Sequence, residues 1–565
     1  MSRYSLILFV AVCVRSLAQE GAPGLKADAR RLQDQTDQVF AKWDTTMSPG
    51  CALSVIQDGR IIYKRGYGMA DLDHDIPITP ETVFHVASIS KQFTAAAILL
   101  LAQEGKLSLD DDVHKYIREL PDFGVPITIR QLIHHTSGLR DQWALLTLAG
   151  WRYSLDLITD DDVLDLVSRQ RDLNFKPGDE YLYCNTGYTL LAQIIKRVSG
   201  QTLREFTTAR IFEPLGMKST YFRDDHAEIV KHIAYGYEEG EGRNVFRLSV
   251  TNFDTVGATS LLTTVEDLAL WIGNFDEPKV GGAAFVARQL ERGKLNSGKE
   301  LDYASGLQHG TYRGLATVGH GGADAGYRAG LTRFPAQHFA VACLCNQAET
   351  NPSLLADKVA DIYLAGQFKE PPRSVATTET TSVSVPDARL AQYAGMYWKG
   401  DDQGLLTFQH DHGKLFLGDT DKNRVALAAF AENQFRFPDS PLTFRFEQTG
   451  GTWHVTRLVD GQQKRDVYGR VEAFKPTAEQ LAEYAGGYVS AEIDAIYRIT
   501  IDGDNLVLKR LKSKPATLKP IVSDYFDGPN SILHFSRDGA GKVNGFLLNT
   551  GRIRNFRFTK SLTTQ

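Results

Sequence analysis

The sequence predicts a mixed α and β domain followed by two all-β barrel domains. Two observations lead to this fold class. Strand-like pairs lie at both ends of residues 27–368 with helices between them, and an internal repeat fills the remainder. One antiparallel sheet that joins both ends of the first domain accounts for this order. The paired runs are CALSVIQ with IIYKRGYG, which flank the turn signal Asp58-Gly59, and YRAGLTRFP with FAVACLCN.

Two helices stand out within the first domain. The pattern over Ala27–Lys42 is typical of an amphipathic helix. Residues Ser88–Gln103 are apolar almost throughout, which indicates a buried helix, and the run is too short to cross a membrane. The first helix is therefore expected to lie on the surface of the domain and the second inside it.

The rest of the chain divides into a linker and two repeats. Residues 369–387 are rich in Thr, Ser and Pro and have little to bury, which is typical of a linker. Beyond it, LAQYAGMY at 390–397 returns as LAEYAGGY at 481–488, a shift of 91 residues. Both copies continue as alternating runs broken by Gly and Asp. We therefore expect small β-barrels at 388–474 and 476–562 that fold without the first domain.

The first residues have the pattern of an export signal. Arg3 supplies a positive charge, Leu6–Val14 is a short apolar run, and Ser16-Leu17-Ala18 places small residues where a signal peptidase cuts. The pattern predicts a signal peptide at 1–18 and a periplasmic or extracellular mature chain without an integral membrane segment. The alternative is a buried N-terminal strand.

Charge and cysteine content bear on partners and metals. The formal net charge is −5 and no Lys/Arg run stands out, so nucleic acid is not expected as a partner. The four cysteines beyond the signal, Cys51, Cys184, Cys343 and Cys345, are too few for a disulfide framework and are expected to be small buried residues. No spaced Cys/His set indicates a metal site. The sequence does not predict the oligomeric state.

An S-x-x-K motif, Ser88-Ile89-Ser90-Lys91, opens the apolar helix, and no other Ser in the chain is followed three residues later by Lys. Positions i and i+3 share a helix face, so the lysine amine is expected beside the serine hydroxyl. Burial favours the neutral amine, which can then accept the serine proton. The motif predicts Ser88 as a nucleophile and Lys91 as its base.

Tyr183-Cys184-Asn185 is the only Y-x-N sequence in the chain, and it lies in a loop that leads into a buried helix. A phenol near a lysine cation can lose its proton more easily and serve in acid/base catalysis. The Asn185 amide can hold the lysine side chain or a substrate carbonyl.

A glycine-rich segment, Gly319-His320-Gly321-Gly322-Ala323, is the third element. Glycines such as Gly322 let a strand backbone approach a ligand closely, and His320 is a candidate substrate-binding residue. The backbone N–H groups of Ser88 and Ala323 are expected to form an oxyanion hole.

These motifs in this order resemble the penicillin-recognising serine hydrolases, and more narrowly the group of class C β-lactamases, D-aminopeptidases and serine esterases. The stretches LIHHTSGLR, FKPGDEYLYCNTGY and GHGGADAGYRAGLTRFP are similar as well. The resemblance covers residues 27–368. It implies a serine β-lactamase/DD-peptidase-like fold, an antiparallel sheet with a helical subdomain, and an acyl-enzyme cycle that needs no cofactor. The two C-terminal repeats resemble the barrels attached to D-aminopeptidases of this group.

By this resemblance, Ser88 is the nucleophile, Lys91 and Tyr183 transfer protons, and Asn185 binds substrate. The expected substrate is a small molecule or peptide with a peptide-like amide, and a D-residue is one option. An esterase or β-lactamase with the same site is the second interpretation, and a decayed homologue that only senses peptidoglycan-like ligands is the third. His320 stands where the β-lactamase pattern K-T-G has a lysine, which disfavours β-lactams.

Overall fold

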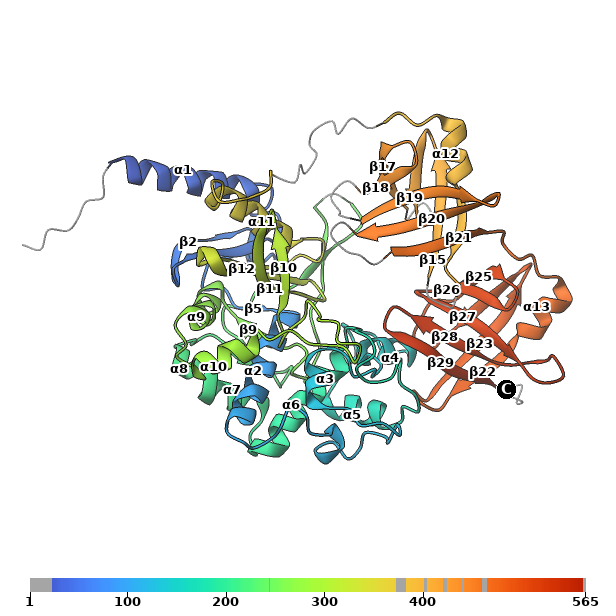
Figure 1. Cartoon of the computed structure of the whole chain (residues 1–565), viewed down its shortest axis with the longest axis horizontal. Coiled ribbons are helices and arrows are strands. Elements are labelled where there is room, and N and C mark those ends of the chain that lie inside the picture. The colour runs from blue at the N-terminus through green and yellow to red at the C-terminus, as the bar shows by residue number, and fades with distance from the viewer. Residues whose placement is uncertain are drawn as a thin grey trace, which may run out of the picture.

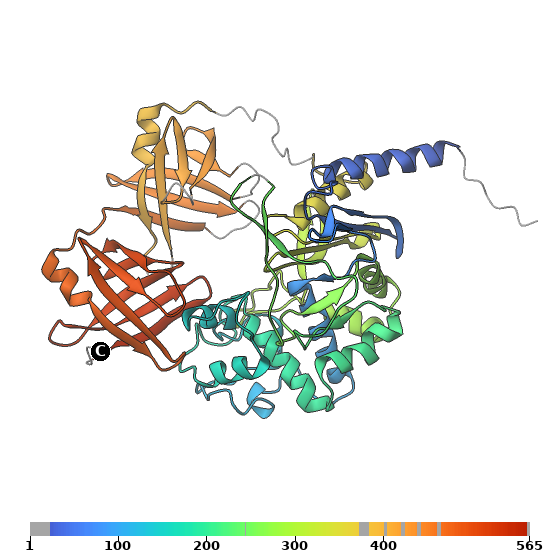
Figure 2. The same ribbon diagram turned by 180° about the vertical axis from the view of Figure 1, so that it is seen from behind.

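The computed structural model describes residues 23–242, 244–371, 383–400, 404–419, 424–437, 442–459 and 465–561. The predicted signal peptide at 1–18 and residues 372–382 of the predicted linker lie outside the described residues. Figures 1 and 2 show a first domain of sheet and helices, with the two barrels side by side along one flank of it.

The first domain is built around a six-stranded antiparallel sheet, as predicted. Its order is β10-β11-β12-β13-β1-β2, so the first and last strands of the domain meet at its centre, where β1 pairs with β13. The strands are β1 (Cys51–Gln57), β2 (Arg60–Tyr67), β10 (Gln308–Tyr312), β11 (Leu315–Asp324), β12 (Tyr327–Phe334) and β13 (Phe339–Cys345). Short sheets are formed by β3 (Met69–Asp71) with β4 (Ile76–Pro77), by β5 (Phe84–His85), β9 (Leu261–Thr263) and β6 (Tyr221–Phe222), and by β7 (Tyr237–Glu239) with β8 (Phe246–Leu248).

Helices cover both faces of the main sheet. Every residue of β13 is buried, and its side chains alternate between two cores. Ala340, Ala342 and Leu344 join the core of the helical region, whereas Val341 and Cys343 join a second core with residues of α1 (Pro23–Phe40) and α11 (Pro352–Tyr363). The sheet is thus a middle layer between two helical layers.

The helical region contains the expected buried helix. Nearly every residue of α2 (Ser90–Gln103) is buried, as an all-round apolar pattern requires. Besides α1 and α11, the other helices described in the first domain are η1 (Ala87–Ile89), η2 (Val113–Lys115), α3 (Ile129–Ile133), α4 (Gln142–Leu148), α5 (Asp160–Ser168), α6 (Asn185–Ser199), α7 (Leu203–Thr207), η3 (Thr208–Phe212), α8 (Glu213–Leu215), α9 (Val265–Asp276), α10 (Gly282–Gln289) and η4 (Pro335–Gln337). Among the described residues, no helix combines the length and the apolar character that a membrane crossing requires.

The cysteines differ from the prediction in one respect. All four are buried, but Cys51 and Cys345 form a disulfide, while Cys184 and Cys343 are free. Cys51 on β1 lies directly opposite Cys345 on β13. The two residues are 294 positions apart, so only the pairing of the terminal strands brings them together.

Each C-terminal repeat forms a closed eight-stranded barrel with one short helix. The first comprises α12 (Asp387–Tyr393), β14 (Gly395–Trp398), β15 (Leu405–Asp411), β16 (Lys414–Leu417), β17 (Val425–Ala431), β18 (Gln434–Arg436), β19 (Leu442–Thr449), β20 (Thr452–Val459) and β21 (Arg465–Val471). The second comprises α13 (Ala478–Tyr484), β22 (Gly486–Ser490), β23 (Ala495–Asp502), β24 (Asn505–Lys509), β25 (Ala516–Val522), β26 (Tyr525–Gly528), β27 (Ser531–Arg537), β28 (Val543–Thr550) and β29 (Ile553–Lys560).

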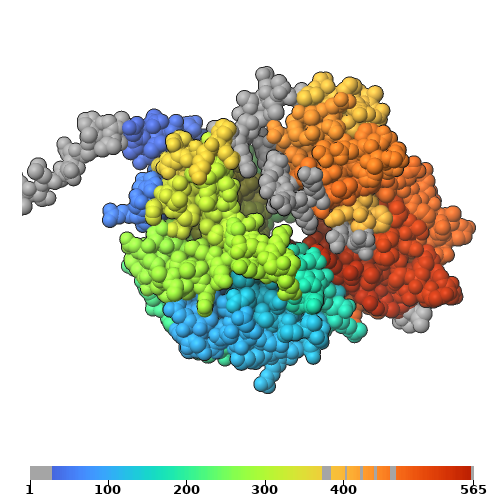
Figure 3. All heavy atoms as spheres, viewed as in Figure 1, coloured from blue at the N-terminus to red at the C-terminus, as the bar shows by residue number. Residues whose placement is uncertain are grey.

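The second barrel is joined to the first domain by buried contacts, whereas the first barrel has a core of its own. The Tyr497 hydroxyl donates to the Leu148 carbonyl at 2.9 Å. Arg140, whose side chain has no exposed surface, donates to Glu492 Oε2 at 2.7 Å. Figure 3 shows the second barrel in direct contact with the helical region. A buried arginine therefore depends on a carboxylate from another domain.

We expect Glu492→Ala to lower the free energy of unfolding by about 3 kcal/mol, because it leaves the Arg140 guanidinium buried without its counter-ion. Urea unfolding followed by tryptophan fluorescence measures the change. Lys512→Ala is the matched control, since Lys512 pairs with Asp156 across the same two domains but is 45% exposed. An exposed pair contributes at most about 1 kcal/mol. Equal losses in the two variants would show that the buried pair has no special role.

Candidate active site

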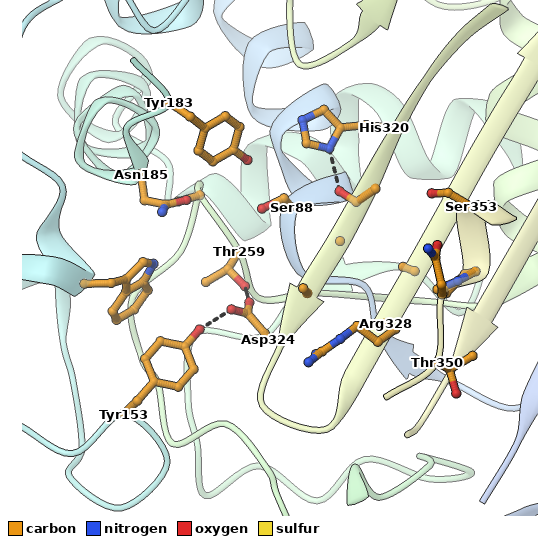
Figure 4. A pocket seen from close by; sticks show the side chains of 18 of the residues that line it. Ser88, Tyr153, Tyr183, Asn185, Thr259, His320, Asp324, Arg328, Thr350 and Ser353 are labelled. Atoms are coloured by element: carbon orange, nitrogen blue, oxygen red, sulfur yellow. Dashed lines mark hydrogen bonds between the residues drawn. The ribbon is translucent and has the colours of Figure 1, made fainter. Parts of the chain in front are cut away.

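The residues singled out by sequence converge on one pocket of about 740 Å³. Figure 4 shows the pocket with Ser88 near its centre and the side chains of Tyr183, Asn185 and His320 around it. The pocket lining also includes Gly322 and Ala323 of β11, while Lys91 is fully buried behind Ser88. The structure therefore brings together three segments that are separated by long stretches of sequence.

Ser88 lies on η1, two residues before α2 begins. The preceding residue, Ala87, has a φ of 47°, a conformation that residues other than glycine seldom adopt. Such strained positions cluster at functional sites, where the surrounding structure fixes them. The helix predicted from Ser88 thus starts as a 3₁₀ turn, yet the S-x-x-K spacing still brings Lys91 to Ser88.

The Lys91 amine has three contacts, and only one of them can take part in proton transfer. Its Nζ lies 2.9 Å from Ser88 Oγ, 2.9 Å from Asn185 Oδ1 and 2.7 Å from the Ala258 carbonyl. The two latter oxygens can only accept hydrogen bonds. A neutral amine therefore donates its two protons to them and directs its lone pair at the Ser88 hydroxyl.

Burial lowers the pKa of Lys91 to about 7, although the carboxylates of Asp324 and Asp141 act to raise it. A large fraction of Lys91 is then neutral at neutral pH. The amine can accept the Ser88 proton without first losing one of its own.

Asp141, which the sequence did not single out, orients the Asn185 amide. Asn185 Nδ2 and its backbone N–H donate to Asp141 Oδ2 at 2.8 and 2.7 Å. Because the carboxylate can only accept, the amide nitrogen must face Asp141 and the amide oxygen must face Lys91. Asp141 also accepts from the first backbone N–H groups of α4 as its N-cap, so it is fixed from both sides.

The Tyr183 phenol is buried beside Ser88, and its hydroxyl has no hydrogen-bond partner among the described residues. Burial raises the pKa of Tyr183 well above its ordinary value, although the neighbouring Ser88 acts to lower it. The expectation that the lysine would ease loss of the phenol proton is therefore wrong. Although Lys91 Nζ lies 4.9 Å from the ring centroid, desolvation is the largest cause of the shift, and the phenol remains a proton donor.

His135 supports the Tyr183 ring from behind. The two ring centroids are 4.2 Å apart. The Cys184 backbone N–H donates to His135 Nδ1 at 3.0 Å, so the ring proton resides on Nε2. The structure thus makes His135 part of the wall behind the site.

His320 projects from β11 toward the same pocket and is held by two neighbours. Its Nδ1 donates to the Gly321 carbonyl at 2.5 Å, and the Tyr303 hydroxyl donates to Nε2 at 3.1 Å. Burial and the nearby Lys91 lower the pKa of His320 below its ordinary value, so the ring is neutral at neutral pH. No motif pointed to Tyr303.

Gly322 lets β11 approach the Ser88 turn. A Cβ atom at this position would lie 2.3 Å from the Val86 carbonyl oxygen, whereas one at Gly321 would have at least 3.7 Å of clearance. Only Gly322 is therefore required for the close approach. It places Ala323 and Ser88 along the same pocket wall, where their backbone N–H groups are expected to bind an oxyanion.

The second barrel also reaches this pocket. Arg552, in the turn between β28 and β29, lines it and lies 5.0 Å from the Tyr183 ring centroid. Its guanidinium is 3.6 Å from Asp141 Oδ2. The repeat pattern gave no sign that a barrel residue takes part in the site.

Comparisons with known proteins agree with the fold. A model of the Beta-lactamase family matches residues 36–365. The D-aminopeptidase of Brucella anthropi is 27% identical over 530 residues, which cover 91% of this chain and 95% of that protein. The D-aminopeptidase of Brucella ovis is 30% identical over 532 residues, with coverages of 91% and 96%.

A solved structure shows a likeness of fold across the domains. The octameric penicillin-binding protein homologue from Pyrococcus abyssi has a TM-score of 0.55 and 24% identity, and the match covers 86% of this chain and 99% of that one. The family model alone spans more than half of the chain. The chain therefore belongs to the Beta-lactamase family of serine hydrolases, with two closed barrels after the family's domain.

Proposed function

We propose that this protein hydrolyses peptide-like amides through an acyl-enzyme at Ser88, and that the acyl half of its substrate is a D-amino acid. The observation that carries the proposal is the contact of 2.9 Å between Lys91 Nζ and Ser88 Oγ, with both other Lys91 partners restricted to accepting. The D-amino acid is suggested by the two D-aminopeptidases that are similar over 91% of the chain.

In the acylation step, Ser88 Oγ attacks the substrate carbonyl carbon while its proton moves to the Lys91 lone pair. The carbonyl oxygen becomes an oxyanion and accepts hydrogen bonds from the backbone N–H groups of Ser88 and Ala323. The C–N bond then breaks, and the leaving nitrogen takes a proton from the Tyr183 phenol, which regains one from Lys91. An ester between Ser88 and the acyl group remains.

In the deacylation step, the same groups act in reverse. Lys91 accepts a proton from water, either directly or through the Tyr183 phenol, and the resulting hydroxide attacks the ester carbonyl. Ser88 Oγ leaves and takes back the proton. Asn185 holds Lys91 in place during both steps, because turning its amide oxygen away from the amine would break the hydrogen bond from its amide nitrogen to Asp141.

We further propose export to the periplasm or the exterior of the cell. The N-terminal pattern supports this localisation. The disulfide between Cys51 and Cys345 provides independent support, because such bonds persist in oxidising compartments and are rare in the cytosol.

We expect a fluorophosphonate to label the protein once, at Ser88, since this hydroxyl lies beside a base in the structure. Ser88→Ala should abolish labelling as measured by intact mass and peptide mapping. Ser353→Ala is the matched control, because Ser353 lines the same pocket but has no hydrogen bond from a lysine among the described residues, and this variant should be labelled like the natural protein. Labelling that persists in Ser88→Ala would refute the assignment.

We expect His320→Lys to raise kcat/KM for nitrocefin roughly tenfold or more, because an ammonium group there can bond the carboxylate beside the β-lactam amide. The neutral imidazole suits substrates without that carboxylate, so the variant should lose activity on neutral esters and amino-acid amides. Steady-state kinetics on nitrocefin and p-nitrophenyl acetate measure both changes. If the natural protein hydrolyses nitrocefin faster than any ester or amide tested, His320 does not disfavour β-lactams.

A further inference from the structure

Asp324 is a carboxylate in the wall of the catalytic pocket that the acylation steps do not use. It ends β11, two residues beyond Gly322, and its side chain is 8% exposed. Residues i and i+2 of a strand share a face, so Asp324 projects to the same side as Gly322 and His320. Figure 4 shows it on the opposite side of Ser88 from His320.

The hydrogen bonds of Asp324 come from neutral groups. The Tyr153 hydroxyl donates to Oδ1, and the Thr259 hydroxyl donates to Oδ2. Among the described residues, the only basic side chain within 4.0 Å of the carboxylate is that of His85, with Nε2 at 4.0 Å. The nearby Arg328 directs its guanidinium at the carbonyl oxygens of Ala325 and Tyr327 instead.

His85 does not neutralise this charge. The Ala87 backbone N–H donates to its Nδ1 at 3.2 Å, so the single ring proton resides on Nε2. Burial lowers the pKa of His85 below its ordinary value. Arg328 and Lys91 act on the Asp324 carboxylate only through charge interactions at longer range. A buried carboxylate without a cation in direct contact is costly unless a charge from outside completes the pair.

The position of Asp324 along β11 identifies the half of the substrate that it faces. Tyr183, which protonates the leaving nitrogen in the proposed function, has its ring centroid 6.2 Å from that of His320. The leaving group therefore lies on the His320 side of Ser88. The acyl half then lies on the other side, toward Asp324, where Trp143 and Tyr153 form an aromatic wall.

We propose that Asp324 binds the ammonium group of the acyl half, so that the protein selects amino-acyl amides and esters with a free amine. The inference rests on the proposed function and specifies its substrate class. The ammonium completes the charge pair, and its remaining protons face the pocket. Acylation of the amine removes the charge and adds bulk against the aromatic wall, so N-acylated substrates are excluded.

The test compares alanyl p-nitroanilide, in both D and L forms, with its N-acetyl derivative. The natural protein should prefer the free amine. Asp324→Asn should lower kcat/KM for the free amine by roughly 50-fold more than it lowers kcat/KM for p-nitrophenyl acetate, because the lost charge pair is desolvated. Any effect of Asp324 on Lys91 cancels when the free-amine substrate is compared with p-nitrophenyl acetate, since hydrolysis of both substrates uses Lys91 as the base. The matched control is Asp267→Asn. Asp267 is likewise a buried carboxylate, and it accepts hydrogen bonds from the Thr220 hydroxyl and the Ser219 backbone N–H, but it lies away from the pocket.

A second measurement does not depend on whether the variant folds. The natural protein should bind 1-aminoethylboronic acid roughly tenfold or more tightly than its N-acetyl form. Equal affinities, or equal losses on the amine and the ester in Asp324→Asn, would overturn the role of Asp324. Absence of both Ser88 labelling and p-nitrophenyl acetate hydrolysis would instead overturn the proposed function itself.

Discussion

The site depends on one constraint, a lysine amine kept in a dry environment between three oxygen atoms. Water would hold Lys91 as an ammonium ion and remove its ability to take a proton. The buried helix α2 provides the dry environment, and Gly306 packs so closely against the Lys91 backbone that a Cβ atom there would lie 2.5 Å from the Lys91 carbonyl carbon. The Asn185 and Ala258 oxygens then fix the direction of the lone pair toward Ser88.

This constraint extends into the second barrel. Asp141 orients Asn185, and the residue before it, Arg140, is held by Glu492 of the barrel. Arg552 approaches Asp141 from the same domain. Arg140 and Asp141 are adjacent in one loop. They thus connect the docking of the second barrel to the position of Asn185, which accepts a hydrogen bond from Lys91. The second barrel therefore contributes Arg552 to the lining of the pocket as well as being an attached domain.

Much of the fold and part of the site could be predicted from sequence, because their signals are local. Alternation indicated β1 and β13, and the 91-residue repeat indicated the barrels. Short motifs indicated Ser88, Lys91, Tyr183, Asn185 and His320, which the structure brings into or beside one pocket. Asp141, Tyr303 and Arg552 could not be found, since they act through contacts across long stretches of chain. Asp324 was within reach, because it follows His320 and Gly322 at strand spacing, but an isolated aspartate carries no motif.

The most direct test of the central claim is the rate at which a fluorophosphonate labels Ser88 as a function of pH. Labelling requires the neutral Lys91 amine, whose conjugate acid has a pKa of about 7. The rate should therefore rise about tenfold per pH unit below this value and level off above it. A rate that keeps rising toward about pH 10 would mean a lysine with an ordinary pKa, and it would contradict the account.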